Sequence, residues 1–387
     1  MSFNFLSGIN ALGSGVLGTL IPFLFVLTLV VFFHELGHFL VARWAGVRVL
    51  VFSIGFGPEL FGFNDRHGTR WKVSAVPLGG YVKFFGDDNA ASVPDHGAIA
   101  AMSADERKHS FVDQRVGSRA AIVVAGPLAN FLLAIVIFTC LALVYGKPIT
   151  SPRVDKVQPD SAAAAAGFQP GDVVLTINGR RIESFPEMQQ IVSTSAGETL
   201  TFEVDRGGVR VTLKATPALK ETKDRFGNVI RQGLLGIERV PTPNERHFEP
   251  VGPIEAVGIG LDRTWFFVER TFSFIGGMLS GRESTDQLGG PIRIAQVSGQ
   301  VASEGFSALL SLTGYLSVMI GLFNLFPVPL LDGGHLLFYG IEAARGKPLS
   351  ERAQEVGFRI GLAIVLMLMI FATYNDILHI AAQLTSS

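Results

Sequence analysis

Four long runs without a charged residue constrain the fold of this chain more than any other feature of its sequence. They extend over residues 16–33, 120–146, 305–331 and 360–375, and apolar residues after Asp376 lengthen the last and shortest run. A helix of about 20 apolar residues crosses the hydrocarbon core of a bilayer. The sequence therefore predicts an α-helical polytopic membrane protein with about four transmembrane helices, surrounded by membrane lipid.

Composition supports this class and excludes others. Charged residues make up 17% of the 387 residues, whereas a soluble domain usually contains about 25%. The net charge of −1 gives no reason to expect a nucleic acid partner. The single cysteine, Cys140, excludes a disulfide within the chain and zinc sites that need two or four cysteines. Cys140 lies in the second apolar run, where we expect a small buried hydrophobic residue.

The distribution of lysine and arginine predicts the orientation of the runs. The loops that follow the first and third runs are rich in both residues, whereas the N-terminal tail and the residues after Asp376 contain neither. Positively charged loops remain in the cytoplasm. Both termini, and the long segment between the second and third runs, are therefore predicted to face outward.

The outward segment divides into a β-rich part and a helical part. Residues 151–245 are typical of a small, mainly-β soluble domain, with a hairpin signal, RGG, at 206–208 and a short helix that Gly167 ends. Residues 246–304 contain an amphipathic helix at 254–280 whose five charged residues fall on one stripe. We expect this helix to lie at the membrane interface, and packing on the outer domain is the alternative. The N-terminal and C-terminal membrane halves are residues 1–150 and 305–387.

The inner loop contains WKVSAVPLGGYVKFF, residues 71–85. Two β-rich runs flank Gly79 and Gly80, which predicts a β-hairpin. Its apolar residues allow it to dip into the edge of the bilayer, and an unpaired strand edge could accept another strand. An ordinary surface hairpin is the alternative.

The first apolar run ends in HELGH, residues 34–38, which is an H-E-x-x-H motif. Residues i and i+4 share one face of a helix, so His34 and His38 can bind the same zinc ion. Glu35 projects nearby, where a carboxylate can deprotonate a zinc-bound water. Because ionisable residues are costly in a membrane and usually functional, the motif predicts a catalytic site with one Zn²⁺ per chain.

A catalytic zinc needs a third protein ligand. Asp332 is the best candidate, because the predicted topology brings the end of the third run to the same depth as His34. His335, one helical turn further, is the rival ligand, and Asp332 could instead cap a helix. Asn324, in otherwise apolar sequence, would bind substrate or satisfy a backbone break at two nearby prolines. Asn130, in the second run, would support the site or pack between helices.

Together these motifs resemble the site-2 protease family of intramembrane metalloproteases, and within it the bacterial RseP-type regulators of sigma-E signalling. The resemblance rests on HELGH at 34–38, AGPLANF at 125–131 and NLFPVPLLDGGH at 324–335. GFGP at 55–58, PLGGYVKF at 77–84 and LGGPI at 288–292 extend it. The motifs follow the order of the family over nearly the whole chain.

The resemblance implies particular roles for these residues. His34, His38 and Asp332 would bind zinc, with Glu35 as the catalytic base and Asn324 as a substrate contact. Asn130 and His335 remain candidates for supporting roles. A membrane-associated hairpin would receive substrate as an added strand through Pro77, Leu78, Gly79, Gly80, Tyr81, Val82, Lys83 and Phe84. The outer domain resembles a PDZ domain, of which many RseP-type members have two, and it could contact peptide or substrate.

The expected activity is zinc-dependent cleavage, within the membrane, of transmembrane segments of single-pass proteins such as anti-sigma factors or remnant signal peptides. The expected location is the bacterial inner membrane, with both termini and the PDZ-like domain in the periplasm and the active site near the cytoplasmic side. A metal transporter is one alternative, but the ionisable groups cluster at one depth instead of following a path. A non-catalytic scaffold built around the PDZ-like domain is the other, and the intact Glu35 argues against it.

Overall fold

The computed structural model describes residues 16–87, 97, 101–149, 151–223, 229–240, 247–279 and 289–386. The chain forms two compact units. The membrane unit combines the residues up to 140 with 257–276 and the residues from 288 onward, and the β-rich unit is built from 141–256 and 277–287. Each unit is described below by itself.

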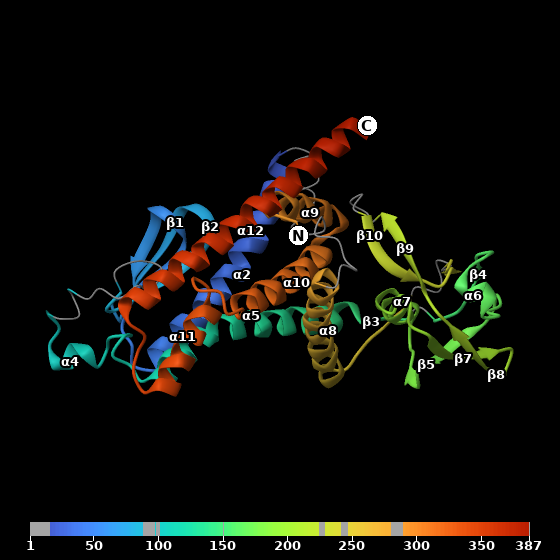
Figure 1. Ribbon diagram of the computed structural model, residues 1–387, viewed down its shortest axis with the longest axis horizontal. Helices are drawn as coiled ribbons and strands as arrows, with labels where there is room; N and C mark the ends of the chain where they lie inside the picture. The colour runs from blue at the N-terminus through green and yellow to red at the C-terminus, as the bar shows by residue number, and fades with distance from the viewer. Residues whose placement is uncertain are drawn as a thin grey trace, which may run out of the picture. The chain divides into compact units, whose positions relative to one another are not determined.

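Within the described residues, four helices are long and apolar enough to cross a bilayer, over Leu17–Trp44, Val116–Tyr145, Phe306–Asn324 and Arg352–Leu378. They belong to α2 (Val16–Trp44), α5 (Val116–Tyr145), α10 (Phe306–Asn324) and α12 (Glu351–Ser386) (Figure 1). The four predicted spanning helices are thus confirmed as helices of suitable length and composition. Cys140 lies on an exposed face of α5. Its predicted burial was wrong, because lipid can cover an apolar helix face that no protein contacts.

The third apolar run does not form one continuous helix. α10 ends at Asn324, and α11 (Asp332–Arg345) begins after an irregular segment, 325–331. Pro327 and Pro329 explain the break, because proline has no N–H to continue a helix and disfavours helical backbone in the residue before it. The segment folds back on the first turn of α11, where a Cβ on Gly333 would collide with its carbonyl oxygens.

The predicted amphipathic helix is α8 (Pro253–Leu279). Its central part packs on two membrane helices. A Cβ on Gly260 would collide with the Thr139 hydroxyl of α5, and the Thr271 hydroxyl donates to the Met319 sulfur of α10 at 3.1 Å. Small residues on this face let the helix backbones approach closely. The interfacial location of α8 stays a prediction.

A further helix, α9 (Pro291–Glu304), was not predicted from the sequence. It crosses the start of α2, because a Cβ on Gly299 would lie 2.9 Å from the α2 backbone. The buried Asp376 carboxylate of α12 accepts hydrogen bonds from the amides of Gly290 at 2.9 Å and Arg293 at 3.0 Å. Negative charge is favourable at a helix N-terminus, which explains how the apolar helix α12 tolerates this acidic residue.

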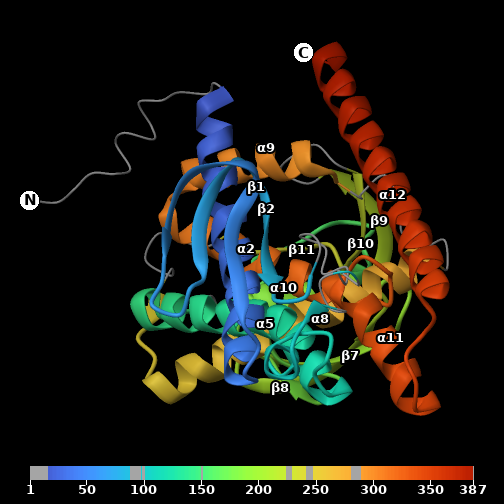
Figure 2. The same ribbon diagram turned by 90° about the vertical axis from the view of Figure 1, so that its left-hand side faces the viewer.

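The sheet of the membrane unit lies beside α2 (Figure 2). It consists of β1 (Val49–Asn64) and β2 (Arg70–Phe84), and a short helix, α4 (Ala104–Arg107), follows it. Both strands bend, so that Ile54 of β1 pairs with Val73 and with Gly80, one from each half of β2. The paired segments therefore follow one another in the order 59–64, 70–74, 51–56 and 80–84. Residues 80–84 form one edge of this sheet.

The predicted turn of the hairpin was wrong. The chain reverses at 65–69, where the Asp65 carboxylate accepts hydrogen bonds from the amides of His67 and Thr69, both at 2.9 Å. Gly79 and Gly80 lie within β2. The two runs that flank them pair with β1, one on each side, and not with each other. The two glycines mark a bend of the strand. This bend was predicted as a turn, because the sequence alone did not reveal that both flanking runs pair with β1.

The β-rich unit contains a four-stranded antiparallel sheet in the order β6–β5–β7–β8. Its strands are β5 (Val173–Ile177), β6 (Arg180–Arg181), β7 (Leu200–Arg206) and β8 (Val209–Ala215), and its helices are α6 (Ala162–Ala165) and α7 (Phe185–Thr194). Two smaller sheets pair β4 (Lys156–Val157) with β11 (Ile237–Glu238) and β9 (Ala218–Lys223) with β10 (Val229–Leu234). The predicted hairpin at 206–208 and the helix that ends before Gly167 are both present.

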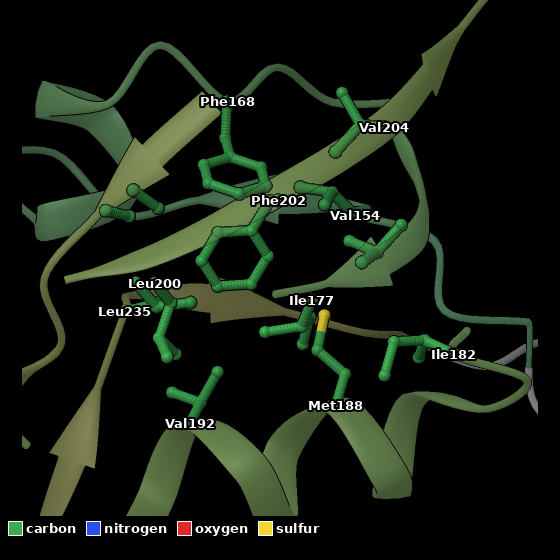
Figure 3. Close-up of a cluster of buried hydrophobic side chains, with 13 residues drawn as sticks. Val154, Phe168, Ile177, Ile182, Met188, Val192, Leu200, Phe202, Val204 and Leu235 are labelled. Carbon is green, nitrogen blue, oxygen red and sulfur yellow. The ribbon is translucent and has the colours of Figure 1, made fainter. Parts of the chain in front are cut away.

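The core of this unit lies between the sheet and α7. Phe168 and Phe202 meet edge to face with ring centroids 5.3 Å apart, and Met188 and Val192 of α7 point toward them (Figure 3). All four side chains are buried. Burying an aliphatic or aromatic side chain stabilises a fold by about 1.5–3 kcal/mol, so this cluster gives the unit a core of its own.

A two-stranded ribbon forms where the chain enters and leaves the β-rich unit. β3 (Lys147–Ile149) pairs with β12 (His247–Glu249), and Ile149 lies opposite His247. The Lys147 ammonium forms an ion pair with Glu183. The entering and leaving strands are therefore held side by side and are not independent linkers.

An ion pair between a buried carboxylate and a partly exposed arginine braces the same unit. Arg206 donates to both oxygens of the fully buried Asp172 carboxylate at 2.8 Å, and the Gln169 amide donates to one of them at 2.9 Å. Burial alone would raise the pKa of Asp172, but the hydrogen bonds from Arg206 and Gln169 outweigh it and leave that pKa below its ordinary value. The ionised carboxylate therefore stabilises the unit at neutral pH.

We expect Asp172→Asn to lower the free energy of unfolding of the β-rich unit at pH 7, because a neutral amide accepts weaker hydrogen bonds from Arg206 than the buried carboxylate does. The folded pKa of Asp172 lies below the unfolded value of about 3.9, so its contribution is complete above that value and is lost as pH falls through the folded pKa. Hydrogen–deuterium exchange of β7 and β8 in the full-length protein, corrected for intrinsic rates, measures both effects.

The control is Asp205→Asn, which changes a carboxylate that accepts from the Gly208 amide in an exposed turn. We expect this variant to keep most of the protection of the parent. Equal protection of Asp172→Asn and Asp205→Asn at pH 7 would contradict the stabilising role of the ion pair.

Candidate metal centre and active site

Three acceptor atoms converge where α2 meets the start of α11. The Asp332 Oδ2 lies 3.2 Å from His34 Nε2 and 3.5 Å from His38 Nε2, and the two Nε2 atoms lie 3.3 Å apart. Helical spacing aligns the two histidines on α2, and Asp332 is the first residue of α11. All three side chains are largely buried. The structure thus brings together the three residues that the sequence singled out as metal ligands.

The other nitrogen of each imidazole fixes its orientation. His38 Nδ1 lies 2.9 Å from the Ile122 carbonyl oxygen, to which only a protonated Nδ1 can donate. His34 Nδ1 lies 3.2 Å from the side-chain amide of the fully buried Asn130. The two ends of that amide are distinguished by their hydrogen bonds. With the amide nitrogen toward His34, the Asn130 oxygen is buried without a partner among the described residues. We therefore assign the oxygen to the His34 side, where it accepts a hydrogen bond from Nδ1–H. Both Nε2 atoms then present lone pairs to Asp332.

This arrangement fits a metal ion. Asp332 Oδ2 is buried and has no hydrogen-bond partner. A carboxylate oxygen and two imidazole lone pairs facing one another without a proton repel each other unless a cation lies between them. Ligands about 2.0–2.1 Å from a tetrahedral zinc lie about 3.3 Å apart, which matches the three distances. Among the described residues, these three form the one such group.

Glycines allow α5 and β2 to approach the site closely. A Cβ on Gly126 of α5 would collide with the His38 Nε2 that faces Asp332. A Cβ on Gly80 of β2 would lie 2.7 Å from the Ser53 carbonyl oxygen and 3.1 Å from the Glu35 side chain. Any larger residue at either position would displace a side chain of the HELGH motif. The sequence reasoning missed the role of Gly126, for which its place in AGPLANF was the available signal.

Glu35 faces a cavity of about 200 Å³ next to the three acceptor atoms. The Val82 amide of β2 hydrogen-bonds to its carboxylate. His34, His38 and Asp332 line the cavity together with Asn324 and His335, and aromatic residues complete its lining. A carboxylate beside a metal position is the arrangement in which a bound water can lose a proton.

The structure divides the predicted strand residues into two groups. Gly80, Tyr81, Val82 and Phe84 line the cavity. Pro77, Gly79 and Lys83 belong to β2 but are not among the lining residues, and the side chain of Leu78 lies outside the described residues. Only the edge segment 80–84, and not the bend before it, is thus adjacent to the site.

Five lining residues were not predicted, namely Phe111, Val123, Leu330, Leu331 and Tyr339. Phe111 and Tyr339 are buried aromatic residues of the cavity wall. Leu330, in the irregular segment before Asp332, has a φ of +99°. A side chain in this backbone region is strained by about 1–3 kcal/mol and is found mostly at functional sites. Its two neighbouring prolines marked the break, but no pattern in the sequence indicated a positive φ.

Comparison with known proteins gives a match over most of the chain. The family model described as "Peptidase family M50" matches residues 22–368. A protein of Agrobacterium fabrum named "Putative zinc metalloprotease Atu1380" is 51% identical over 361 residues, covering 93% of this chain and 96% of that protein. Metalloprotease MmpA of Caulobacter vibrioides is 40% identical, with coverage of 94% and 96%. Zinc metalloprotease RasP of Geobacillus kaustophilus is 31% identical, with coverage of 93% and 98%.

Among solved structures, the PDZ domain of the SdrC-like protein from Listeria monocytogenes matches 24% of this chain and 86% of its own length, with 20% identity. The TM-score is 0.18. A likeness of this size carries no argument about the β-rich unit.

We expect Gly126→Ala to weaken zinc binding by about 10- to 100-fold, the range seen when groups that orient a metal ligand are disturbed. The added methyl group displaces His38 Nε2, while the higher helix propensity of alanine leaves α5 intact. Zinc retained by the purified variant against a graded series of chelator concentrations measures the change.

The matched control is Gly117→Ala in the same helix, where an added Cβ meets no atom within 4 Å. This variant should retain zinc as the parent does. The explanation of Gly126 by close approach fails if the two alanine variants retain equal amounts of zinc.

Proposed function

The chain belongs to peptidase family M50 and is a zinc metalloprotease, and we propose that it cleaves transmembrane segments of single-pass proteins within the membrane. The observation that carries this proposal is the convergence of His34, His38 and Asp332 in the second half of a helix, Leu17–Trp44, that is long and apolar enough to span a bilayer. Ionisable side chains at such a position mark functional sites. Anti-sigma factors and remnant signal peptides are substrates of the appropriate kind.

In this proposal His34, His38 and Asp332 hold the zinc, and Glu35 is the catalytic base. When bound, zinc supplies a water of lowered pKa and polarises the scissile carbonyl. Glu35 takes a proton from the water as the water oxygen bonds to the carbonyl carbon. It then delivers a proton to the amide nitrogen as the C–N bond breaks. The hydrogen bond from Val82 keeps the Glu35 carboxylate at the cavity.

The substrate would bind as an added strand. A transmembrane helix must unwind before attack, because its carbonyls are hydrogen-bonded within the helix. Residues 80–84 pair with β1 on one side, and no described strand pairs with their other edge. Gly80, Tyr81 and Val82 also line the cavity beside Glu35. Backbone pairing along this edge would hold an extended substrate across the base.

Asn324 would contribute a further contact to the substrate backbone. It lines the cavity at the end of α10. Its side-chain amide has no hydrogen-bond partner among the described residues. A polar amide in an apolar environment costs free energy unless it is bonded, and a substrate backbone group would supply the partner. Asn130 would act by orienting His34.

We further propose that the protein resides in the bacterial inner membrane, with both termini and the β-rich unit in the periplasm and the zinc site toward the cytoplasm. The lysine- and arginine-rich loops support this orientation. α9 contacts the start of α2, and Asp376 of α12 caps the N-terminus of α9. These contacts support placing the start of α2 and the C-terminal part of α12 on the same side of the membrane.

We expect Glu35→Gln to retain zinc and to lose proteolysis by several orders of magnitude, because the amide cannot accept the proton of the water. The measurement is cleavage of a single-pass substrate reconstituted with the purified protein in proteoliposomes, together with the zinc content. Glu355→Gln is the control, since Glu355 forms an exposed i,i+4 pair with Arg359, and it should cleave as the parent does. Substantial cleavage by a zinc-loaded Glu35→Gln protein would refute Glu35 as the base.

The β-rich unit, which we interpret as PDZ-like, would act as a filter for substrates. In the proposed topology this unit is periplasmic and the zinc site is toward the cytoplasm, so it would supply no catalytic groups, because the hydrocarbon core is about 30 Å thick. It could instead exclude proteins with bulky outer domains and admit trimmed ones. Bracing of α8 is the other role open to it.

Deletion of residues 151–245 tests the filter. Because Ile149 lies opposite His247, a short glycine-containing turn can join β3 to β12 without strain. We expect the deletion variant to cleave a minimal substrate as the parent does, and to cleave a substrate with a large outer domain faster than the parent. A zinc-loaded deletion variant that discriminates as the parent does would rule out the filter. Loss of cleavage of both substrates would favour the bracing role.

A further inference from the structure

His335 has no role in the proposed zinc site, yet its imidazole lies in the same cavity. It lines the cavity together with Glu35 and Asp332, but it is not part of the group of three converging acceptors. His335 follows Asp332 by three residues on α11, so the two side chains share a helix face. Neither of its ring nitrogens has a hydrogen-bond partner among the described residues. A neutral imidazole carries one N–H, which is therefore available to a molecule in the cavity.

Aromatic packing fixes the His335 ring. Its centroid lies 5.4 Å from that of Phe358 on α12 and 6.4 Å from that of Tyr339 on α11. Tyr339 is held in turn by the Arg119 guanidinium, 4.8 Å from its ring centroid, and Arg119 is paired with Glu342 at 2.5 Å. A donor whose orientation is set before substrate binds costs no reorganisation during the reaction.

Two other polar side chains line the cavity, Tyr81 and Asn324. Tyr81 stacks on Phe56 with ring centroids 6.0 Å apart, and the Lys72 ammonium lies 5.4 Å from its ring. Asn324 ends α10 beside the irregular segment and is not held by an aromatic contact in the described part of the chain. His335 is thus a cavity donor whose ring is held by aromatic packing on two sides.

We propose that His335 is a catalytic residue that donates its imidazole N–H to the oxyanion developing on the scissile carbonyl. The inference rests on the proposed protease function. As the water oxygen bonds to the carbonyl carbon, Glu35 takes the water proton and the carbonyl π electrons move onto the carbonyl oxygen. His335 keeps its proton throughout. Its hydrogen bond strengthens as the oxygen becomes negative, since charge-assisted hydrogen bonds are about twice as strong as neutral ones, so it favours the transition state over the bound substrate.

Three variants of the full-length protein separate donation from packing. His335→Phe keeps a ring between Phe358 and Tyr339 but has no N–H. His335→Gln and His335→Met have nearly the same size and both favour helix, but only glutamine has a donor. We expect His335→Phe and His335→Met to lower kcat by about 10²- to 10³-fold with KM nearly unchanged, as for removal of one oxyanion donor. His335→Gln should be at least about tenfold more active than His335→Met.

Two further measurements do not depend on turnover. Zinc content should equal that of the parent in all three variants, whereas Asp332→Ala should lose the metal. Affinity for a peptide phosphinate, whose tetrahedral anion imitates the oxyanion, should fall in His335→Phe and His335→Met in step with kcat. The affinity of these variants for the product peptide should stay within about twofold of that of the parent, because an interaction made only with the oxyanion does not contribute to binding of the product.

Several results would overturn the proposal. Equal kcat for His335→Gln and His335→Met, or parental kcat for His335→Phe, excludes donation by His335. Loss of zinc from the His335 variants assigns this residue to the metal instead. A fall in phosphinate affinity in Asn324→Leu, with none in the His335 variants, assigns the oxyanion to Asn324. If the parent cleaves no transmembrane substrate, the proposed function fails, and phosphinate affinity still decides the role of His335.

Discussion

The convergence of three acceptor atoms without a proton between them is the constraint on which the rest of the membrane unit depends. His34 Nε2, His38 Nε2 and Asp332 Oδ2 lie 3.2–3.5 Å apart, a spacing that a cation stabilises and that mutual repulsion would otherwise widen. The atoms come from two helices far apart in the sequence. Any element that shifts α11 against α2 therefore changes the separation of Asp332 from the two histidines, and with it the affinity for the metal.

α5 acts as the support of this site, although it supplies none of the converging atoms. The Ile122 carbonyl contacts Nδ1 of His38, and the Asn130 side chain contacts Nδ1 of His34. Both nitrogens point away from Asp332. On the same helix, Gly126 leaves room for His38, and the Ala125 carbonyl would collide with any Cβ on Gly37 of α2. Because lipid offers no hydrophobic drive for helices to associate, close backbone approach and interhelical hydrogen bonds carry the packing. The contacts that hold α2 to α5 are thus the same contacts that orient the histidines.

The sequence predicted the parts of the site that follow from local periodicity. Helical spacing paired His34 with His38, and hydropathy located the four spanning helices. Spacing alone could not choose between Asp332 and His335, which lie one turn apart, since the choice depends on which side chain reaches the α2 imidazoles. The structure has Asp332 beside them, and the ligand role itself stays a prediction. The paired registers of β1 and β2 depend on contacts between segments that are distant in sequence, and so does the capping of α9 by Asp376. Neither leaves a periodic signal.

The irregular segment 325–331 shows why the site lies where it does. Unpaired backbone groups are costly in an apolar environment, so broken helices in membranes occur where they line a cavity. Pro327 and Pro329 have no N–H to satisfy. The amides of residues 325, 326, 328 and 331 all donate to carbonyl oxygens of α10 or of the segment itself. Leu330 alone in the segment has an amide without a partner among the described residues.

Leu330 is also the residue with the positive φ, and it lines the cavity. α12 holds the segment in place, because a Cβ on Gly361 would collide with the Pro329 carbonyl oxygen. Among the described residues, the break in the third apolar run therefore places its one unsatisfied amide and its backbone strain at the wall of the cavity. Residues 80, 81, 82 and 84 of the strand edge line the same cavity. An extended peptide in this cavity would have unpaired backbone groups to offer to Leu330 and to the strand edge, whereas an intact helix has its own groups already bonded.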